Sequence, residues 1–411
     1  MQDGFLFLNL EDKKSFIYIN MEKENLVIPA EFADICPISD KDFHNEMSIL
    51  VEKPMFQQVV KFVMPDNKFS DVRALLLSLN SKLEFQQKVM APLVAGILAK
   101  TSDGLTHSGM ENLDADTPYL HITNHRDIVL DSAQLSYLLA SQGLDTVEIA
   151  IGNNLLIFEW ITKLVRLNKS FIVKRNLGRL QTLAAAIQLS RYIHFAIKEK
   201  HSSVWLAQRE GRCKDSNDRT QESLLKMLTY GNRDVSMLES LKELNIAPIA
   251  ISYEYDPNDY LKATEFLLKS KDPNFKKSQE DDLVSMQTGI MGYKGKIHYS
   301  FVPCINEKLN NIPADLDKLL MIRRVCAIID HEIHSNYKIF KTNYIAHDIL
   351  FDNKDFADKY APEECEAFKA YLDGQIAKVK VPYNELDRNF MYKCMLEMYS
   401  NPLTNQLEAL K

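Results

Sequence analysis

The chain has 411 residues, of which 46% are hydrophobic and 26% are charged, and these proportions are those of a soluble globular protein. A formal net charge of -7 argues against nucleic acid as a partner, because phosphate backbones bind to basic surfaces. Six cysteines without a C-x-x-C pair indicate reduced thiols in a cytosolic setting, rather than zinc ligands or disulfides. Long apolar stretches and a signal-peptide pattern are both missing, so we do not expect a membrane-spanning segment.

The N-terminal region, residues 1–80, contains two short apolar segments at 15–21 and 25–32. We expect these segments to be extended or to form short strands. Between residues 71 and 100 the apolar side chains recur at helical spacing, which predicts one or two long helices. The sequence assigns no role to this N-terminal extension.

Strand-like and helix-like segments alternate between residues 118 and 302. This order predicts an α/β fold with a mixed, largely parallel sheet flanked by helices. The expected strands are 118–124, 147–153, 170–175, 202–210, 247–255 and 295–305, and the expected helices are 127–141, 156–167, 180–200 and 221–231. We place this sheet in a domain of residues 81–310. Residues 311–411 are expected to form a helical C-terminal region.

The first of these strands ends in the triplet His125-Arg126-Asp127, which also occurs in the catalytic loop of protein kinases. A kinase needs an asparagine five residues after the aspartate to hold magnesium, and this chain has Ser132 there. A glycine-rich phosphate loop is also missing before the triplet. We therefore reject the kinase interpretation.

A histidine at a strand end is well placed to act as a general base, because its intrinsic pKa lies near neutral pH. A neighbouring carboxylate, either Asp131 or Asp127, would fix its tautomer and stabilise the imidazolium ion. The purely structural alternative is that Asp127 caps the next helix and His125 is an ordinary surface residue. The triplet alone does not decide between these interpretations.

Two cationic clusters follow later strands. They comprise Lys174 and Arg175 after one strand, and Arg209, Glu210, Gly211, Arg212 and Lys214 after another. Arginine binds phosphate oxygens in a bidentate manner, and a glycine lets the backbone approach a ligand closely. Since ligands of open α/β sheets bind at the carboxyl ends of strands, the two clusters predict a phosphate site. Each cluster alone is more often a solvated run of charges.

In this order the motifs resemble those of the glycerolipid acyltransferase family, over roughly residues 85–305. The matching segments are NHRDIVLD from Asn124, FIVKR from Phe171, REGRCK from Arg209 and APIAISYE from Ala247. The family separates its histidine and aspartate by four residues, whereas five separate His125 from Asp131, so Asp127 stays an alternative partner. The family's third-block arginine falls on Cys213, which leaves Arg212 or Lys214 to replace it.

The resemblance implies acyl transfer from acyl-CoA or acyl carrier protein to a hydroxyl of glycerol 3-phosphate or lysophosphatidate. His125 would remove the hydroxyl proton, and the cationic clusters would hold the acceptor phosphate. Neither a metal nor a cofactor is expected. We expect a cytoplasmic protein, peripheral on the cytosolic membrane face. The alternatives are O-acylation of a lyso-aminolipid and a non-catalytic, lipid-binding member of the same fold.

Two weaker signals remain. The segment HEIH at 331–334 is one residue shorter than the zinc motif H-E-x-x-H, so we expect no metal there. The helix expected at 180–200 has one apolar face and basic residues toward its end. Core packing is the ordinary explanation of such a helix, and contact with a membrane interface is the alternative.

Overall fold

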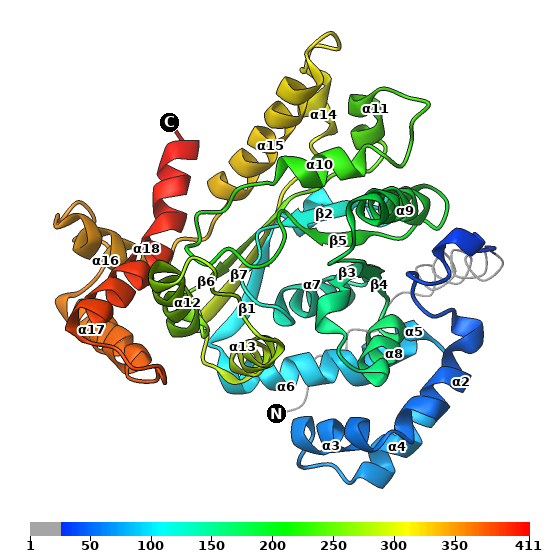
Figure 1. Cartoon of the computed structure of the whole chain (residues 1–411), viewed down its shortest axis with the longest axis horizontal. Coiled ribbons are helices and arrows are strands. Elements are labelled where there is room, and N and C mark those ends of the chain that lie inside the picture. The colour runs from blue at the N-terminus through cyan, green and yellow to red at the C-terminus, as the bar shows by residue number, and fades with distance from the viewer. Residues whose placement is uncertain (1–25) are drawn as a thin grey trace.

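A computed structural model describes residues 26–411, in which seven strands form one central sheet (Figure 1). The sheet order is β1-β7-β6-β2-β5-β3-β4, and every neighbouring pair is parallel except the antiparallel pair β6 and β7. The strands are β1 (Gly104–Ser108), β2 (Leu120–Thr123), β3 (Glu148–Gly152), β4 (Ser170–Val173), β5 (Val204–Ala207), β6 (Ile249–Tyr253) and β7 (Lys296–Phe301). The predicted mixed, largely parallel sheet is thus confirmed.

Helices cover both faces of this sheet. On one face, Ile149 and Trp205 pack against α6 (Ala91–Thr101) and α7 (Leu130–Ser141). On the other face, Ile122 and Leu206 pack against α9 (Arg179–Lys198), α10 (Glu222–Leu228) and α15 (Lys318–Ser335). Every residue of β2 and β6 is buried, including the polar side chains of His121, Thr123 and Ser252.

The described part of the N-terminal region is helical. For the segment at 25–32 we expected an extended run or a short strand, and the strand is wrong. Its described part contains a 3-10 turn at Ala30–Phe32, and the segment has no neighbouring strand to pair with. The segment at 15–21 lies outside the described residues. The helices are α2 (Asp40–Val51), α3 (Pro54–Val63), α4 (Phe69–Leu77) and α5 (Lys82–Phe85), and a π-helical turn, η2 (Gln86–Met90), joins α5 to α6.

Residues 71–100, which were predicted to form one or two long helices, lie in two helical stretches: α4, and the continuous run of α5, η2 and α6. The second stretch begins after Ser81, because the Ser81 hydroxyl caps α5 by accepting a hydrogen bond from the Glu84 amide at 3.1 Å. The helices α2 and α4 pack around Phe43, Met47 and Leu76, in a small core separate from the sheet.

The C-terminal region is helical, as predicted. The remaining helices are α8 (Glu159–Leu167), α11 (Met237–Lys242), α12 (Asp259–Lys271), α13 (Gln279–Met291), α14 (Asn306–Asn310), α16 (Lys341–Phe351), α17 (Pro362–Ile376) and α18 (Glu385–Ala409). Helices α12, α16, α17 and α18 share a core that includes Ile345, Phe368 and Met395, and they lie together beside the β1 side of the sheet in Figure 1. Between residues 26 and 411, no helix is both long and apolar enough to cross a bilayer.

Candidate active site

The candidate site begins where β2 ends. Asn124, the first residue after the strand, is fully buried and fixed to β6: its Nδ2 donates to the Ile251 carbonyl at 2.9 Å, and its Oδ1 accepts from the Ile251 amide at 2.8 Å. An asparagine side chain can satisfy both groups of a backbone in this way. The position of the next residue, His125, is therefore set by the sheet itself.

His125 is paired with Asp131. Its Nδ1 lies 2.8 Å from Oδ2 of Asp131, whose side chain is fully buried, while 12% of the His125 side chain is exposed. Because an ionised carboxylate only accepts hydrogen bonds, the contact implies a proton on Nδ1 and leaves Nε2 as the basic nitrogen. Within the described residues Nε2 has no hydrogen-bond partner, so it is free to accept a proton.

Three further donors hold the Asp131 carboxylate in place. The amides of Arg126 and Asp127 donate to Oδ2 at 2.6 and 3.0 Å, and the Tyr253 hydroxyl donates to Oδ1 at 3.2 Å. Hydrogen bonds from neutral donors favour the charged form of a carboxylate. This arrangement suits a group that stabilises an imidazolium ion.

Trp205 of β5 forms the apolar wall of the site. Its ring meets the imidazole of His125 edge to face, with centroids 5.6 Å apart and planes at 72°. The indole Nε1 donates to Oγ1 of Thr123 at 3.2 Å, which fixes the tryptophan against β2. Both contacts restrict the orientation of the His125 ring.

Asp127, the alternative partner of His125, has a different place. Its Oδ1 accepts from the amides of Val129 and Leu130 at 2.9 and 2.8 Å, and it forms the turn that leads into α7. Burial raises the pKa of the Asp127 carboxyl, and the nearby Asp131 charge raises it further. The geometry therefore pairs His125 with Asp131, and Asp127 shapes the loop between them.

The two cationic clusters meet at the carboxyl ends of β4 and β5. Nη1 of Arg175 lies 3.3 Å from Oε1 of Glu210, and the Arg175 amide donates to Oδ1 of Asn153 at 2.9 Å. At the end of β3, a Cβ atom on Gly152 would come within 2.9 Å of Nε of Arg175. The glycine therefore lets the guanidinium group lie against the strand end. Gly211, with a φ of +70°, makes the turn after Glu210.

Two arginines of the REGRCK segment, Arg209 and Arg212, have buried nitrogen atoms. Within the described chain, Nε of Arg209 and Nη1 of Arg212 have no hydrogen-bond partner. The charge of Arg212 lowers the pKa of Asp127, which sets this arginine near the His125 loop. The next residue, Cys213, also lies at this loop, because its amide donates to the His125 carbonyl at 3.3 Å. Arg212 is therefore the candidate for the family arginine that the sequence left ambiguous.

The two lysines of these clusters are engaged elsewhere. Nζ of Lys174 lies 2.5 Å from Asp34 and donates to Gln188 at 2.9 Å. Lys214 forms an ion pair with Glu265 of α12, and burial lowers the pKa of its ammonium group. Of the predicted phosphate ligands, the structure brings Arg175 and Glu210 into contact and leaves both lysines with other partners.

The segment HEIH lies in α15 and has structural contacts. Nε2 of His334 is 2.8 Å from the Asp218 carbonyl, and His331 is exposed. In the part of the chain that the structure describes, no group of three or more His, Cys, Asp or Glu side chains is arranged to hold a metal ion.

Sequence reasoning missed the residues that support the His125 loop. Trp205 and Tyr253 lie on strands that were predicted, but nothing in the sequence indicates that their side chains face His125. Arg126 received no role, although its guanidinium group forms a buried ion pair with Asp218. An available signal was that Arg126 is a charged residue directly between His125 and Asp127, in the loop after β2.

Comparison with known proteins finds a family model and a solved structure that match parts of the chain. The family model described as Acyltransferase matches residues 104–252. A search of curated proteins found no match. A search of solved structures found the crystal structure of the 1-acyl-sn-glycerophosphate (LPA) acyltransferase, PlsC, from Thermotoga maritima, at 11% identity and a TM-score of 0.34, over 73% of this chain and 99% of that chain. Residues 104–252, which include the His125 loop and both cationic clusters, form a domain of the Acyltransferase family.

Proposed function

We propose that the protein transfers a fatty acyl group from acyl-CoA or acyl carrier protein to a hydroxyl of a glycerophosphate-type acceptor. The observation that carries the proposal is the buried pairing of His125 with Asp131, which leaves Nε2 of the histidine free at the end of β2. Cationic groups at the neighbouring strand ends supply the second element that such an acceptor requires.

In the proposed reaction His125 acts as a general base. Nε2 takes the proton from the acceptor hydroxyl while that oxygen attacks the thioester carbonyl of the donor. The new C–O bond forms, the C–S bond breaks, and the departing thiolate receives the proton from the imidazolium ion. Asp131 stabilises the positive charge on the ring between these two steps. The chemistry calls for no metal or cofactor beyond the acyl donor.

Arg175 and Arg212 are the groups we propose for the acceptor phosphate. Charge-assisted, bidentate hydrogen bonds from arginine suit a phosphate dianion. Glu210 is the present partner of Arg175, so an incoming phosphate would take over that guanidinium group. Fixing the phosphate would bring the acceptor hydroxyl to Nε2 of His125, and this positioning supplies part of the rate gain.

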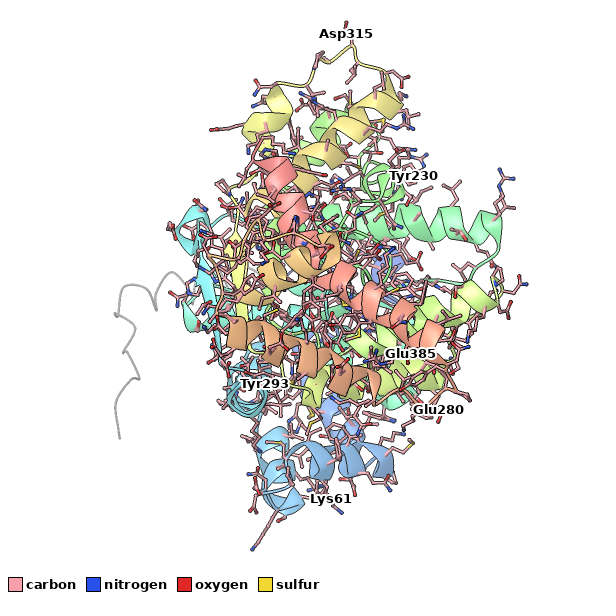
Figure 2. The ribbon with its side chains drawn as sticks, turned by 90° about the vertical axis from the view of Figure 1, so that its left-hand side faces the viewer. Lys61, Tyr230, Glu280, Tyr293, Asp315 and Glu385 are labelled. Atoms are coloured by element: carbon pink, nitrogen blue, oxygen red, sulfur yellow. The ribbon has the colours of Figure 1, made fainter. Side chains whose placement is uncertain are left out.

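A membrane surface is the proposed place of action, because the product is amphipathic. Leu180 and Leu183, near the start of α9, are 85% and 50% exposed, whereas the buried residues of this helix begin at Leu189. In Figure 2 one end of α9 lies near Tyr230 and the other end projects from the body of the protein. This projecting half of the helix supports a peripheral attachment, which we assign to the cytosolic face.

The test is release of free thiol from palmitoyl-CoA and from palmitoyl carrier protein, with glycerol 3-phosphate or lysophosphatidate as acceptor. The parent protein is compared with His125→Ala. We expect acceptor-dependent thiol release that disappears in the variant. If both proteins are folded and neither releases thiol with any donor and acceptor, the proposal is contradicted. A lyso-aminolipid acceptor or a lipid-binding role would then be favoured.

A further inference from the structure

Arg126, the middle residue of the HRD triplet, makes a buried ion pair that the proposed chemistry does not use. Its guanidinium group donates to Asp218, from Nη1 to Oδ1 at 3.2 Å and from Nη2 to Oδ2 at 2.7 Å. Only 5% of the Arg126 side chain and none of the Asp218 side chain is exposed. A fully desolvated pair of this kind is rarely more stabilising than an apolar pair of similar volume, so its presence calls for another explanation.

Tyr337 completes the pair from the C-terminal helical region. Its hydroxyl donates to Oδ2 of Asp218 at 2.5 Å, and the Arg126 guanidinium carbon lies 5.9 Å from the centre of its ring. Tyr337 is in the connection between α15 and α16, beyond residues 104–252 that match the family model. We call Arg126, Asp218 and Tyr337 the Arg126 clamp.

A fourth residue ties down the backbone at the same point. Nζ of Lys262, in α12, donates to the carbonyl of Arg126 at 3.3 Å and is also paired with Asp256. Lys262 is only 3% exposed and likewise lies outside the matched residues. The carbonyl of Arg126 is therefore held from outside the acyltransferase domain by Lys262, and its side chain is held by Asp218 within the domain, which Tyr337 contacts from outside.

One hydrogen bond connects Arg126 of the clamp to Asp131 of the candidate catalytic pair. The Arg126 amide donates to Oδ2 of Asp131 at 2.6 Å, and the same oxygen contacts Nδ1 of His125. A rotation of the His125–Arg126 peptide group would turn the Arg126 amide away from Asp131, and the carboxylate would then shift away from the imidazole. Since a base shifted by a fraction of an ångström loses much of its efficiency, the rigidity of this peptide matters for proton transfer.

We propose that the Arg126 clamp positions His125 and Asp131, so that the C-terminal helical region is required for turnover and not only for stability. Arg126, Asp218 and Tyr337 are positioning residues that act through Asp131. The effect on turnover rests on the proposed acyltransferase function, whereas the effect on the geometry of the pair does not.

The variant Tyr337→Phe tests the clamp with the smallest change. It removes one hydroxyl and leaves the Arg126–Asp218 pair in place. The matched control is Tyr371→Phe, because the Tyr371 hydroxyl also donates to a buried carboxylate, that of Asp259 in α12, at 2.9 Å, but has no contact with the clamp. We expect Tyr337→Phe to lower kcat roughly tenfold, with KM for donor and acceptor unchanged and the control unaffected.

The stronger variant, Asp218→Asn, should lower kcat by about 10²-fold, again without a change in KM. Circular dichroism at the assay temperature establishes that each variant is folded. If Asp218→Asn does not fold, Tyr337→Phe alone decides the outcome. Equal losses in Tyr337→Phe and Tyr371→Phe, or a loss that appears only in KM, would overturn the positioning role.

A proton NMR spectrum gives a readout that does not depend on activity. An imidazole N–H bound to a carboxylate resonates far downfield, and His125→Ala identifies the signal of the pair by removing it. We expect this signal to move or broaden in Tyr337→Phe and to stay unchanged in Tyr371→Phe. If the signal responds while the parent shows no turnover on any donor, the proposed function fails and the clamp stands. An unchanged signal in Tyr337→Phe would refute the clamp.

Discussion

Oδ2 of Asp131 lies 2.8 Å from Nδ1 of His125, and the same oxygen accepts two backbone amides of the intervening loop. A six-residue separation along the chain therefore still gives a direct histidine–carboxylate contact. The loop turns back on itself through these amides, so the residue additional to the family spacing does not move Asp131 away from the ring.

This geometry predicts unequal effects for the two aspartates of the loop. Asp131→Asn removes the negative charge that stabilises the imidazolium ion, and we expect kcat to fall by roughly 10²- to 10⁴-fold. Asp127→Asn keeps an oxygen for the amides of Val129 and Leu130, so kcat should fall less than about fivefold. Thiol release at saturating substrate measures both values. Comparable inactivation by the two substitutions would show that Asp127 takes part in catalysis.

The proposed phosphate site gives a second prediction, with adjacent residues as test and control. Arg175 faces Glu210 at the end of β4, whereas Lys174 is paired with Asp34 and Gln188. Loss of a charge-assisted arginine contact costs about 1.5–3 kcal/mol, so Arg175→Ala should raise KM for the phosphate acceptor roughly 10- to 100-fold. Lys174→Ala should leave this KM within about twofold, because its contacts are exposed. Inhibition by inorganic phosphate should weaken in parallel for Arg175→Ala.

If Lys174→Ala raises the acceptor KM as much as Arg175→Ala does, the acceptor must reach the N-terminal segment that holds Asp34. If neither substitution changes this KM while turnover is normal, the acceptor carries no phosphate, and a lyso-aminolipid becomes the preferred substrate class.

The sequence predicted the sheet and the strand-end motifs because both are local signals. The strands are short runs rich in Val, Ile, Thr and aromatic residues, with polar residues after them. His125 follows β2 and Arg175 follows β4 within two residues, so both could be named from their place after a predicted strand. Their partners could be named only within the same motif, which is why Asp131 and Asp127 could not be told apart before the loop geometry was known.

The contacts that fix the site are long-range, and no local pattern encodes them. Tyr337 reaches Asp218 across 119 residues, and Lys262 reaches Arg126 across 136. Helices α12 and α13, between the last two strands, were not predicted, although α13 approaches the loop so closely that a Cβ on Gly289 would overlap Oδ2 of Asp127. The apolar run at residues 26–32 resembles a strand but has no strand to pair with, and it packs against the core in a 3-10 turn instead.

Helix α12, which packs against the C-terminal helical region, contains a carboxyl group whose protonation should affect stability. Asp259 is fully buried and accepts hydrogen bonds from Tyr371 and Tyr399 at 2.9 and 2.8 Å. Burial, together with the neighbouring Asp256, raises the pKa of the Asp259 carboxyl from 3.8 to about 7. The folded state therefore binds this proton more tightly than the unfolded chain, so the group's contribution to stability is complete below about pH 4 and is lost as the pH rises toward 7.

Asp259→Asn removes this titration, since an amide stays neutral. We expect the difference in Tm, variant minus parent, to increase with pH between about 4 and 7 and to be constant above that range. Thermal unfolding followed by circular dichroism at intervals across this range gives the difference directly. A difference that is flat throughout, or that decreases with pH, would show that Asp259 stays ionised in the folded protein.

The projecting half of α9 is the proposed contact with a lipid surface, and this proposal gives a further prediction. Leu180 and Leu183 share one face of the helix and are largely exposed, and Arg179 beside them makes no ion pair within the described chain. The other four lysines and arginines between residues 174 and 198 are each paired with an acidic side chain, so Arg179 is the cation of this segment that is available to a lipid headgroup. Two exposed leucines beside a cation suit an anionic bilayer. The double variant Leu180→Ser/Leu183→Ser should therefore bind less to vesicles of equal parts phosphatidylglycerol and phosphatidylcholine.

Burial of a leucine contributes about 1.5–3 kcal/mol, so the loss of two should lower the partition coefficient by at least roughly tenfold. Sedimentation with vesicles measures this coefficient, and Leu386→Ser, which removes a leucine of α18 that is 79% exposed, serves as the control. The double variant should keep the parent's turnover on a soluble acceptor, because Leu180 and Leu183 are not among the residues that contact His125 or Arg175. Equal binding by the double variant and the parent would exclude this face of α9 as the lipid contact. A change from a dimer to a monomer without a change in vesicle binding would assign the two leucines to contact between copies of the chain.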